Sequence, residues 1–214
     1  MKNLFYLSFL AFVLISCEKQ SDSSLPEPSN SYLPLQIGNY WVYQHVRIDS
    51  LNQETLLPQT DSVIVDRDTL INEHTYFILE GTNYPINSDS WGIVDILRDS
   101  MGYLVDQTGR IKFSDSNFSD ILDAKIEVFE SDTLYRLSYQ MENEENTYRV
   151  PAGVFEVLNY KGTLVSHREL PGIENPRYLH TRYSPGVGKV MQSYFYLHSP
   201  YAIEKQLIRY HINP

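Results

Sequence analysis

Apolar and polar residues alternate over most of the chain after position 33. The runs are short, rich in aromatic and β-branched residues, and separated by Gly, Pro, Asn and Asp. A two-residue period is typical of a strand with one buried face, and these residue types favour strands. Runs such as 40–48, 75–79, 154–164 and 202–212 are the clearest, and together the runs make roughly eleven short strands.

Turn signals separate the expected strands at the intervals typical of sandwiches and barrels. The acidic segment MENEEN at 141–146 is expected to turn, and Pro-Gly at 185–186 suits the centre of a type II turn. The prolines that fall between strand-like runs, where a missing N–H does little harm, are Pro58, Pro85, Pro151, Pro171, Pro176, Pro185 and Pro200. The sequence therefore predicts an all-β fold, a single antiparallel sheet that is strongly curved or barrel-like.

Helical periodicity is nearly absent. The exception is 116–124, where a Ser or Asp could cap a short helix that carries Phe118, Ile121 and Leu122 on one side. Neither a repeat nor a composition shift suggests a second domain. We therefore expect a signal peptide at 1–16, a lipidated flexible tether at 17–33 and one antiparallel β domain at 34–214.

The N-terminus predicts export. Met1-Lys2-Asn3 is a short basic start, and the run from Leu4 to Ile15 is apolar. As a helix, these roughly twelve residues would reach about 18 Å, too short for a hydrocarbon core of about 30 Å. The length and flanks are those of a secretory signal peptide. Residues 18–31 are rich in Ser, Pro and charge, a composition that predicts a flexible tether.

Cys17 follows Leu14-Ile15-Ser16 and is the only cysteine. This stretch resembles the lipobox of bacterial lipoproteins, which implies a diacylglyceryl group on the thiol, cleavage before Cys17 and acylation of the new amino group. An ordinary signal peptide with a chance cysteine is the alternative. Two or three acyl chains attach a protein stably to a membrane, whereas one is marginal. In some Gram-negative bacteria an Asp at the next position retains lipoproteins in the inner membrane, so Glu18 favours the outer membrane, with the leaflet left open.

Charge and cysteine usage exclude some classes of protein. The chain carries 17 basic and 27 acidic residues, without a Lys/Arg cluster. A nucleic-acid binder needs a basic face that displaces counterions, so nucleic acid is excluded as a partner. If Cys17 is lipidated no disulfide can form, and packing must supply the stability.

The segment GVGK at 186–189 looks like part of a phosphate-binding loop. Such a loop needs a glycine five residues before the Gly-Lys pair and a Ser or Thr after the lysine. Tyr183 and Val190 occupy those positions, and Met191 stands where a dinucleotide motif needs its third glycine. Pro185-Gly186 is therefore interpreted as a turn, Gly188 as a bulge or close-packing position and Val190 to Phe195 as the strand that follows, and no nucleotide is expected.

Catalytic and metal-binding patterns are weak. No G-x-S-x-G motif occurs, and lipidation of Cys17 would exclude a cysteine mechanism. His180, His198 and His211 lie on late strands that could be neighbours, but no close His pair or H-E-x-x-H is present. The pair at 66 and 68, Asp66-x-Asp68, lacks the further positions of a calcium loop, so a turn is expected. We assign no catalytic residue, metal or cofactor.

Tyrosine is unusually frequent, with 17 copies. Its ring suits strands and interfaces, and it also serves as a platform for sugars and hydrophobic ligands. Tyr194, Phe195, Tyr196 and Tyr201 could form an aromatic strip, with ordinary sheet packing as the default interpretation.

Three segments resemble motifs of uncharacterised β-rich lipoproteins of Gram-negative bacteria. PLQIGNYWVY at 34–43 is similar to their opening PLxxGxxWxY, VPAGVF at 150–155 to a mid-chain PAGxF, and SPGVGKV at 184–190 to PGVGxV. The resemblance implies the fold and the envelope address but no activity. From the residues themselves, Trp41 is expected to anchor the core, and Pro-Ala-Gly and Pro-Gly to reverse the chain.

We therefore expect a cell-envelope lipoprotein, anchored to the membrane through Cys17, whose non-enzymatic β domain binds or supports a partner. A protein, a hydrophobic molecule or a glycan is the expected ligand class. The alternative is a lipocalin-like or lipoprotein-carrier-like protein that encloses one small hydrophobic ligand, and an envelope hydrolase is the third hypothesis. A carrier needs an aromatic-lined cavity of roughly several hundred Å3, and a hydrolase needs a Ser or His beside an acid in a pocket.

Overall fold

The computed structural model describes residues 31–85 and 90–214, so the predicted signal peptide, Cys17 and residues 18–30 of the tether lie outside the described residues. The described chain contains no helix, and hence none long and apolar enough to cross a membrane. It forms one antiparallel sheet of β1 (Tyr40–Ile48), β2 (Glu54–Ile71), β3 (His74–Gly81), β4 (Gly92–Ser100), β5 (Tyr103–Asp106), β6 (Ile111–Ser114), β7 (Asp123–Phe129), β8 (Asp132–Val150), β9 (Gly153–Ser166), β10 (Arg177–Ser184), β11 (Gly188–Tyr194) and β12 (Ala202–His211).

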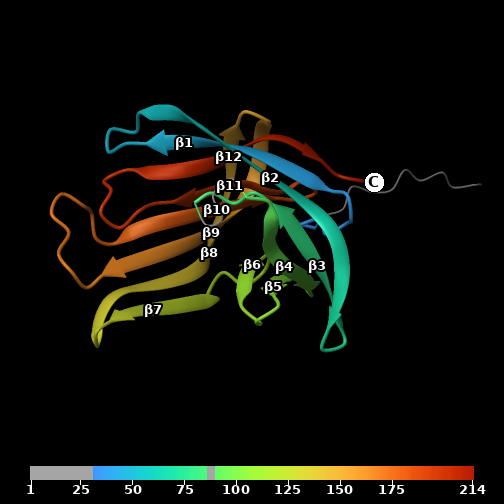
Figure 1. The fold of residues 1–214 in the computed structure, drawn as a ribbon, viewed down its shortest axis with the longest axis horizontal. Coiled ribbons are helices and arrows are strands. Elements are labelled where there is room, and N and C mark those ends of the chain that lie inside the picture. Colours follow the sequence, from blue (N-terminus) through green and yellow to red (C-terminus); the bar gives the residue numbers. More distant parts are fainter. Residues whose placement is uncertain (1–30, 86–89) are drawn as a thin grey trace, which may run out of the picture.

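The sheet has the strand order β6-β5-β4-β3-β2-β1-β12-β11-β10-β9-β8-β7. Strands adjacent in sequence are adjacent in the sheet, except for β6 and β7, which form its two edges, and the first and last strands pair in its middle. Figure 1 shows the strands passing from β7 at lower left, over β12 and β1 at the top, to β3 at the right, with β4, β5 and β6 turned back toward the centre. The predicted all-β, barrel-like domain is confirmed.

The barrel is nearly closed, because its two edge strands approach each other without pairing. Arg110, just before β6, forms an ion pair with Asp123 at the start of β7, with Nη2 and Oδ2 2.7 Å apart. The Tyr160 hydroxyl of β9 donates to the carbonyl of Ile111 in β6, at 2.7 Å. Side chains, not a ladder of backbone hydrogen bonds, therefore join the two edges.

The middle of the sheet is covered on both faces. Trp41 and Val42 are adjacent in β1, yet they are only 2% and 9% exposed. Since neighbouring residues of a strand point to opposite faces, β1 has no solvated face here. The tip of the β8–β9 hairpin contacts β12, where the Ala152 N–H donates to the Leu207 carbonyl at 3.0 Å.

One hydrophobic cluster runs through the domain. Its members include Trp41, Val65, Leu104, Tyr183 and Leu207, and it also contains Leu33, which precedes the first strand. The Ser31 carbonyl accepts the Gly186 N–H at 2.9 Å, so Ser31 lies against the turn between β10 and β11. Because the sheet and this core lie within residues 31–214, that part of the chain forms a folding unit with its own core.

The PGVG segment forms the predicted turn. The Val187 N–H bonds to the Ser184 carbonyl at 3.2 Å, and Gly186 has a φ of +70°, which is the type II geometry. Gly188, with a φ of +93°, packs closely, since a Cβ there would lie 3.4 Å from Trp41 Cζ2. Trp41 Nε1 donates to the Val187 carbonyl at 2.6 Å. The first and third sequence motifs therefore meet, and the roles expected of Trp41, Gly186 and Gly188 are confirmed.

The expected helix at 116–124 is wrong. The segment between β6 and β7 is irregular, because the Leu122 N–H donates to the Tyr139 carbonyl at 2.8 Å and the Phe118 carbonyl accepts from Gln140 Nε2 at 2.9 Å, so the two groups that would bond each other in a helix have partners in β8. Phe118 and Leu122 still pack against the core from this loop. The spacing of Phe118 and Leu122 therefore indicates that both residues are packed against the core, and it does not indicate a helix.

The turn expected at MENEEN is also wrong, because β8 continues through it with a shift of register between Glu142 and Asn146 against β9. Pro58 lies inside β2, not between strands. It is tolerated because the β1–β2 register shifts beside it and β3 pairs with β2 only from Val63 onward. The pair at 66 and 68 lies in β2 at another register shift and not in a turn.

Candidate functional site

The barrel encloses a cavity of about 320 Å3. Each of the twelve strands contributes at least one lining residue. Trp41, Tyr43, Leu79, Leu97, Leu104 and Tyr183 supply much of the apolar wall. The apolar lining follows from the alternation of the strands, which turns one side chain in two toward the axis of a barrel.

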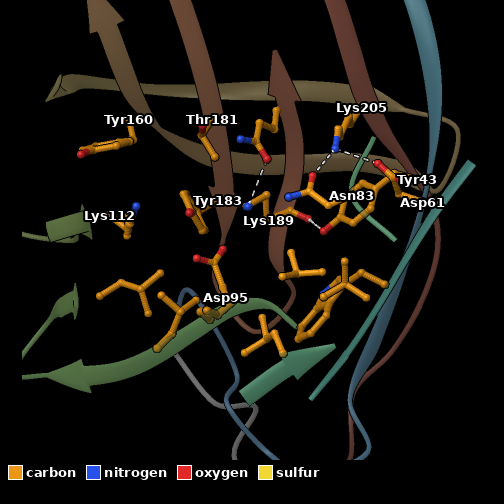
Figure 2. A pocket seen from close by; sticks show the side chains of 18 of the residues that line it. Tyr43, Asp61, Asn83, Asp95, Lys112, Tyr160, Thr181, Tyr183, Lys189 and Lys205 are labelled. Carbon is orange, nitrogen blue, oxygen red and sulfur yellow. Dashed lines mark hydrogen bonds and ion pairs between the residues drawn. The ribbon is translucent and has the colours of Figure 1, made fainter. Parts of the chain in front are cut away.

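The cavity also carries charge, which is unusual for an interior. Lys112, Lys189, Lys205, Asp61 and Asp95 line it, and all five appear in Figure 2 among the side chains around the space. Arg110, Lys125 and Asp123 complete the charged lining beside β6 and β7. In the described part of the chain, five basic and three acidic residues therefore line the cavity of a protein whose net charge is −10.

Lys205 and Asp61 form a buried ion pair at one end of the cavity. Lys205 Nζ lies 2.7 Å from Asp61 Oδ2, and the two side chains are 9% and 2% exposed. Lys205 Nζ also donates to Asn83 Oδ1 at 2.6 Å, as Figure 2 shows. The backbone N–H of Tyr84 donates to Asp61 Oδ1 at 3.1 Å. Each charge is thus paired and hydrogen-bonded, as a buried charge requires.

His45 extends this cluster behind the cavity wall. Its Nε2 lies 3.0 Å from Asp61 Oδ2 and its Nδ1 lies 3.2 Å from the Tyr194 hydroxyl. Burial alone would raise the pKa of Asp61, but hydrogen bonds from His45 and Lys205 outweigh it and hold this pKa at about 2. Asp61 is therefore an acceptor, so the Nε2–H tautomer of His45 donates to it and accepts from Tyr194.

The His45–Asp61 pair provides the histidine beside an acid that the hydrolase hypothesis needs. The ring of His45 is fully buried, however, and it does not line the cavity. Both ring nitrogens have partners, and none of those partners in the described chain is a Ser, Thr or Cys side chain. The arrangement thus supports packing of β1 against β2 and β11, and it offers no activated nucleophile.

Lys189 differs from Lys205 because it has no ion-pair partner within 4.0 Å in the described chain. Its Nζ donates to Gln192 Oε1 at 3.2 Å. Burial lowers the pKa of Lys189, and the approach of Lys205 and Lys112 adds to that effect, against the attraction of Asp95. Lys189 therefore presents a desolvated Nζ group to the cavity, and its charged form would be stabilised by an anion placed there.

Asp95 of β4 faces the same space from the opposite wall (Figure 2). No hydrogen bond or ion pair of its carboxyl group occurs among the described residues. Burial raises the pKa of Asp95, while Lys189 and Lys112 pull it down and Asp106 raises it. Among the described residues, Lys189 and Asp95 are thus a lysine and a carboxyl group of the lining that have no ionic partner within 4.0 Å.

Sequence reasoning missed this site. The sequence indicates only that a strand begins near Lys189, whereas in the structure the turn ends at Val187 and Lys189, the second residue of β11, lines the cavity. The register of β10 against β11 shifts between Arg182 and Tyr183, and this shift lets both Lys189 and Gln192 line the cavity although they are three residues apart. The available signal in the sequence was a lysine followed at once by two apolar residues, Val190 and Met191. In the structure both of these residues are fully buried.

The residues that the sequence brought forward do not assemble into a metal or sugar site. His180 contacts Asn159, and His211 contacts Asn213 beside a stacked Tyr40. Within residues 31–85 and 90–214 there is no cluster of three metal-ligating side chains.

The expected aromatic strip is only partly formed. The rings of Tyr194 and Tyr196 meet edge to face at 6.3 Å, while Phe195 lies under Arg177 and Tyr201 under Arg47. None of the four lines the cavity.

Solved structures share this architecture. One, described as a "putative exported protein with YmcC-like fold" from Bacteroides fragilis, aligns with a TM-score of 0.50 and 13% identity over 84% of this chain and 98% of that chain. The described domain shares that fold. Another, described as a "putative lipoprotein" from Parabacteroides distasonis, aligns with a TM-score of 0.47 and 14% identity over 86% and 99%. No family model matches the sequence, and the comparison with curated proteins gives no match.

Proposed function

We propose that this chain is a lipid-anchored protein of the cell envelope whose β domain binds one small amphipathic molecule inside the barrel. The cavity is the observation that carries the proposal. At about 320 Å3, it falls at the lower end of the range of roughly 300–1,000 Å3 for ligand pockets. Its aromatic and aliphatic wall is the one that the carrier hypothesis needs, which favours this hypothesis over a domain that only supports a partner.

A cavity of this size is costly to keep. Protein interiors pack as densely as organic crystals, and cavities made by mutation cost about 24 cal/mol per Å3. On that scale an empty volume of 320 Å3 would cost on the order of 8 kcal/mol, comparable to a typical net stability of about 5–15 kcal/mol. Water around the lysines lowers the cost, because a polar wall can hold it. An interior that stays hollow despite large available side chains supports the presence of an occupant.

The gap between β6 and β7 supplies a route of entry. The Arg110–Asp123 pair crosses this gap, and Arg110 is 46% exposed. Asp123 is only 11% exposed, so parting this pair costs more than the roughly 0–1 kcal/mol of a fully exposed ion pair. Parting the two edges breaks this pair and the bond from Tyr160 to Ile111, but no strand ladder. A small molecule can thus enter without unfolding the sheet.

Lipidation of Cys17 would explain the proposed location in the cell envelope. A diacylglyceryl cysteine followed by about thirteen tether residues would hold the domain close to an envelope membrane. Cys17→Ala in the full chain should move the protein from the membrane fraction to the soluble fraction, and labelled palmitate should no longer be incorporated. A variant that stays in the membrane fraction would refute the anchor without affecting the cavity.

Binding inside the barrel is testable by fluorescence. Trp41 lines the cavity, whereas Trp91 is 58% exposed, so Trp91→Phe leaves Trp41 as the single indole reporter. In residues 18–214 with this change, octanol or octanoate should shift Trp41 emission in a saturable way. Thr181→Phe, which fills the cavity, should abolish the response, whereas Thr75→Phe on the exposed end of β3 should preserve it. Equal responses in both variants, or none with either amphiphile, would refute the proposed function.

A further inference from the structure

We infer that the ligand carries an anionic head group, a carboxylate or a phosphate, which binds Lys189, while a short apolar chain lies against Trp41 and its neighbours. The inference rests on the proposed function, because it requires the cavity to be the binding site. It adds the charge of the ligand and the residue that recognises it.

Among the described basic residues that line the cavity, Lys189 is the one available to bind an anionic head group. An ammonium group has three N–H donors, and in the described chain one of them is used, by Gln192 Oε1 at 3.2 Å. An unpaired charge held out of water is expensive, by several kcal/mol in real proteins. A chain that needed only stability would place an apolar residue here. A partly buried lysine Nζ with free donors and a cavity in front of it is the arrangement that an anionic head group completes.

The other cations of the lining have carboxylate partners. Lys205 lies 2.7 Å from Asp61, and Arg110 lies 2.7 Å from Asp123. Lys112 lies 3.3 Å from Asp106, and Lys125 lies 2.7 Å from Glu127. An anion that enters the cavity gains little from groups already paired in this way, so Lys189 determines where its head group binds.

The balance of charge favours an anion over a cation. The lining has five basic and three acidic residues within the described chain, although the whole protein is acidic. A low-dielectric wall concentrates such a local excess into the cavity.

Asp95 is compatible with an anion when it is protonated. Burial raises the pKa of this carboxyl group, and a ligand carboxylate beside it would raise the pKa further. A protonated Asp95 donates its O–H to the ligand, while Lys189 donates N–H from the other wall. An ionised Asp95 would instead select a cation, so the charge preference of the cavity distinguishes the two states.

The volume of the cavity sets the length of the ligand's apolar chain. A water occupies about 30 Å3 of liquid, so the cavity holds about ten water-sized groups. Octanoate, with about ten non-hydrogen atoms, matches this volume. Trp41, Leu79, Leu97 and Leu104 provide the apolar surface that its chain would cover.

The test compares octanoate, octyl phosphate, octanol and octylammonium by calorimetry on residues 18–214. A charge-assisted hydrogen bond is worth about 1.5–3 kcal/mol, so at least one anion should bind about ten- to a hundredfold more tightly than octanol. The stronger of octanoate and octyl phosphate identifies the head group. Lys189→Met should remove the preference for the anion and leave octanol affinity within about threefold. Lys161→Met is the matched control, because Lys161 pairs with Glu142 outside the cavity, and it should change neither.

The outcomes separate this inference from the proposed function. If octanol binds as tightly as both anions, or if Lys189→Met leaves the preference intact, the assignment of the head group is overturned while the cavity remains the site. Tighter binding of octylammonium would also overturn it and identify Asp95 as the recognition residue. If none of the four binds, the proposed function itself fails. Lys189→Gln serves as a second variant should Lys189→Met not fold, and Asp95→Asn should retain octanoate binding.

Discussion

The buried Lys205–Asp61 pair yields a sharp prediction about stability. Lys205→Met keeps most of the length and apolar volume of the side chain but removes its charge. Asp61, which is 2% exposed, then keeps its negative charge without the ammonium group 2.7 Å away. We therefore expect Lys205→Met to destabilise the domain.

The structure sets the magnitude of the loss. Removing one partner of a buried ion pair costs about 3–5 kcal/mol. Asp61 retains hydrogen bonds from His45 and from the Tyr84 N–H, at 3.0 and 3.1 Å, so the lower end of this range is expected. For a domain of this size, about 3 kcal/mol corresponds to a fall in Tm of roughly 6–12 °C.

Urea unfolding and thermal unfolding of residues 18–214 measure this loss. Lys125→Met is the matched control, because the side chain of Lys125 is 51% exposed beside Glu127. That exposed pair should be worth about 0–1 kcal/mol. In the double variant Asp61→Asn/Lys205→Met no unpaired charge remains, so its loss should be smaller than the sum of the two single losses.

The reasoning fails if Lys205→Met is as stable as Lys125→Met. That result would mean that the pair is solvated and that the end of the cavity near Asn83 is open to water. It would also fail if the double variant lost as much as the two single variants together, because the two charges would then not interact.

Three further predictions concern the scaffold. Gly188→Val should cost about 1–3 kcal/mol in urea unfolding, because a Cβ there lies 3.4 Å from Trp41 at a φ of +93°; an unchanged midpoint would refute the close packing. Leu207→Ala, at a position with 0% exposure, should cost about 2–5 kcal/mol, and a loss below about 1 kcal/mol in the same assay would place Leu207 outside the core. Asp61 has a pKa of about 2 in the fold against an ordinary value of 3.8, so the stability it contributes is complete above about pH 4 and is lost as the pH falls toward 2. Urea midpoints between pH 2 and 5 should therefore change less in Asp61→Asn than in the unchanged domain, and parallel profiles would contradict the low pKa.

Local chemistry made the strands and turns predictable. Alternation and β-branched residues located β1, β3, β9 and β12, and Pro-Gly at 185–186 specified its turn. The same signals misled where a longer-range contact decided the outcome. Phe118 and Leu122 have helical spacing, but Tyr139 and Gln140 of β8 bond the Leu122 N–H and the Phe118 carbonyl that a helix would pair with each other.

The candidate site was much less predictable than the fold. Four strands lie between β4 and β11 in the sheet. Lys189 and Asp95 face each other because the curvature of the sheet brings these two strands to opposite sides of one cavity. A sequence period reports which residues of one strand share a face, but not which strands oppose each other across a barrel. The shift of register between β10 and β11 also turned Lys189 inward, and no local motif marks such a shift.

A crystal structure of residues 18–214 with a bromine-labelled octanoate, carrying the bromine on its last carbon, tests the central claim most directly. The account predicts an anomalous bromine peak within the cavity beside Trp41 or Leu97, with the carboxylate within hydrogen-bond distance of Lys189 Nζ. A peak outside the barrel, or a cavity filled by its own side chains at a saturating ligand concentration, would contradict it.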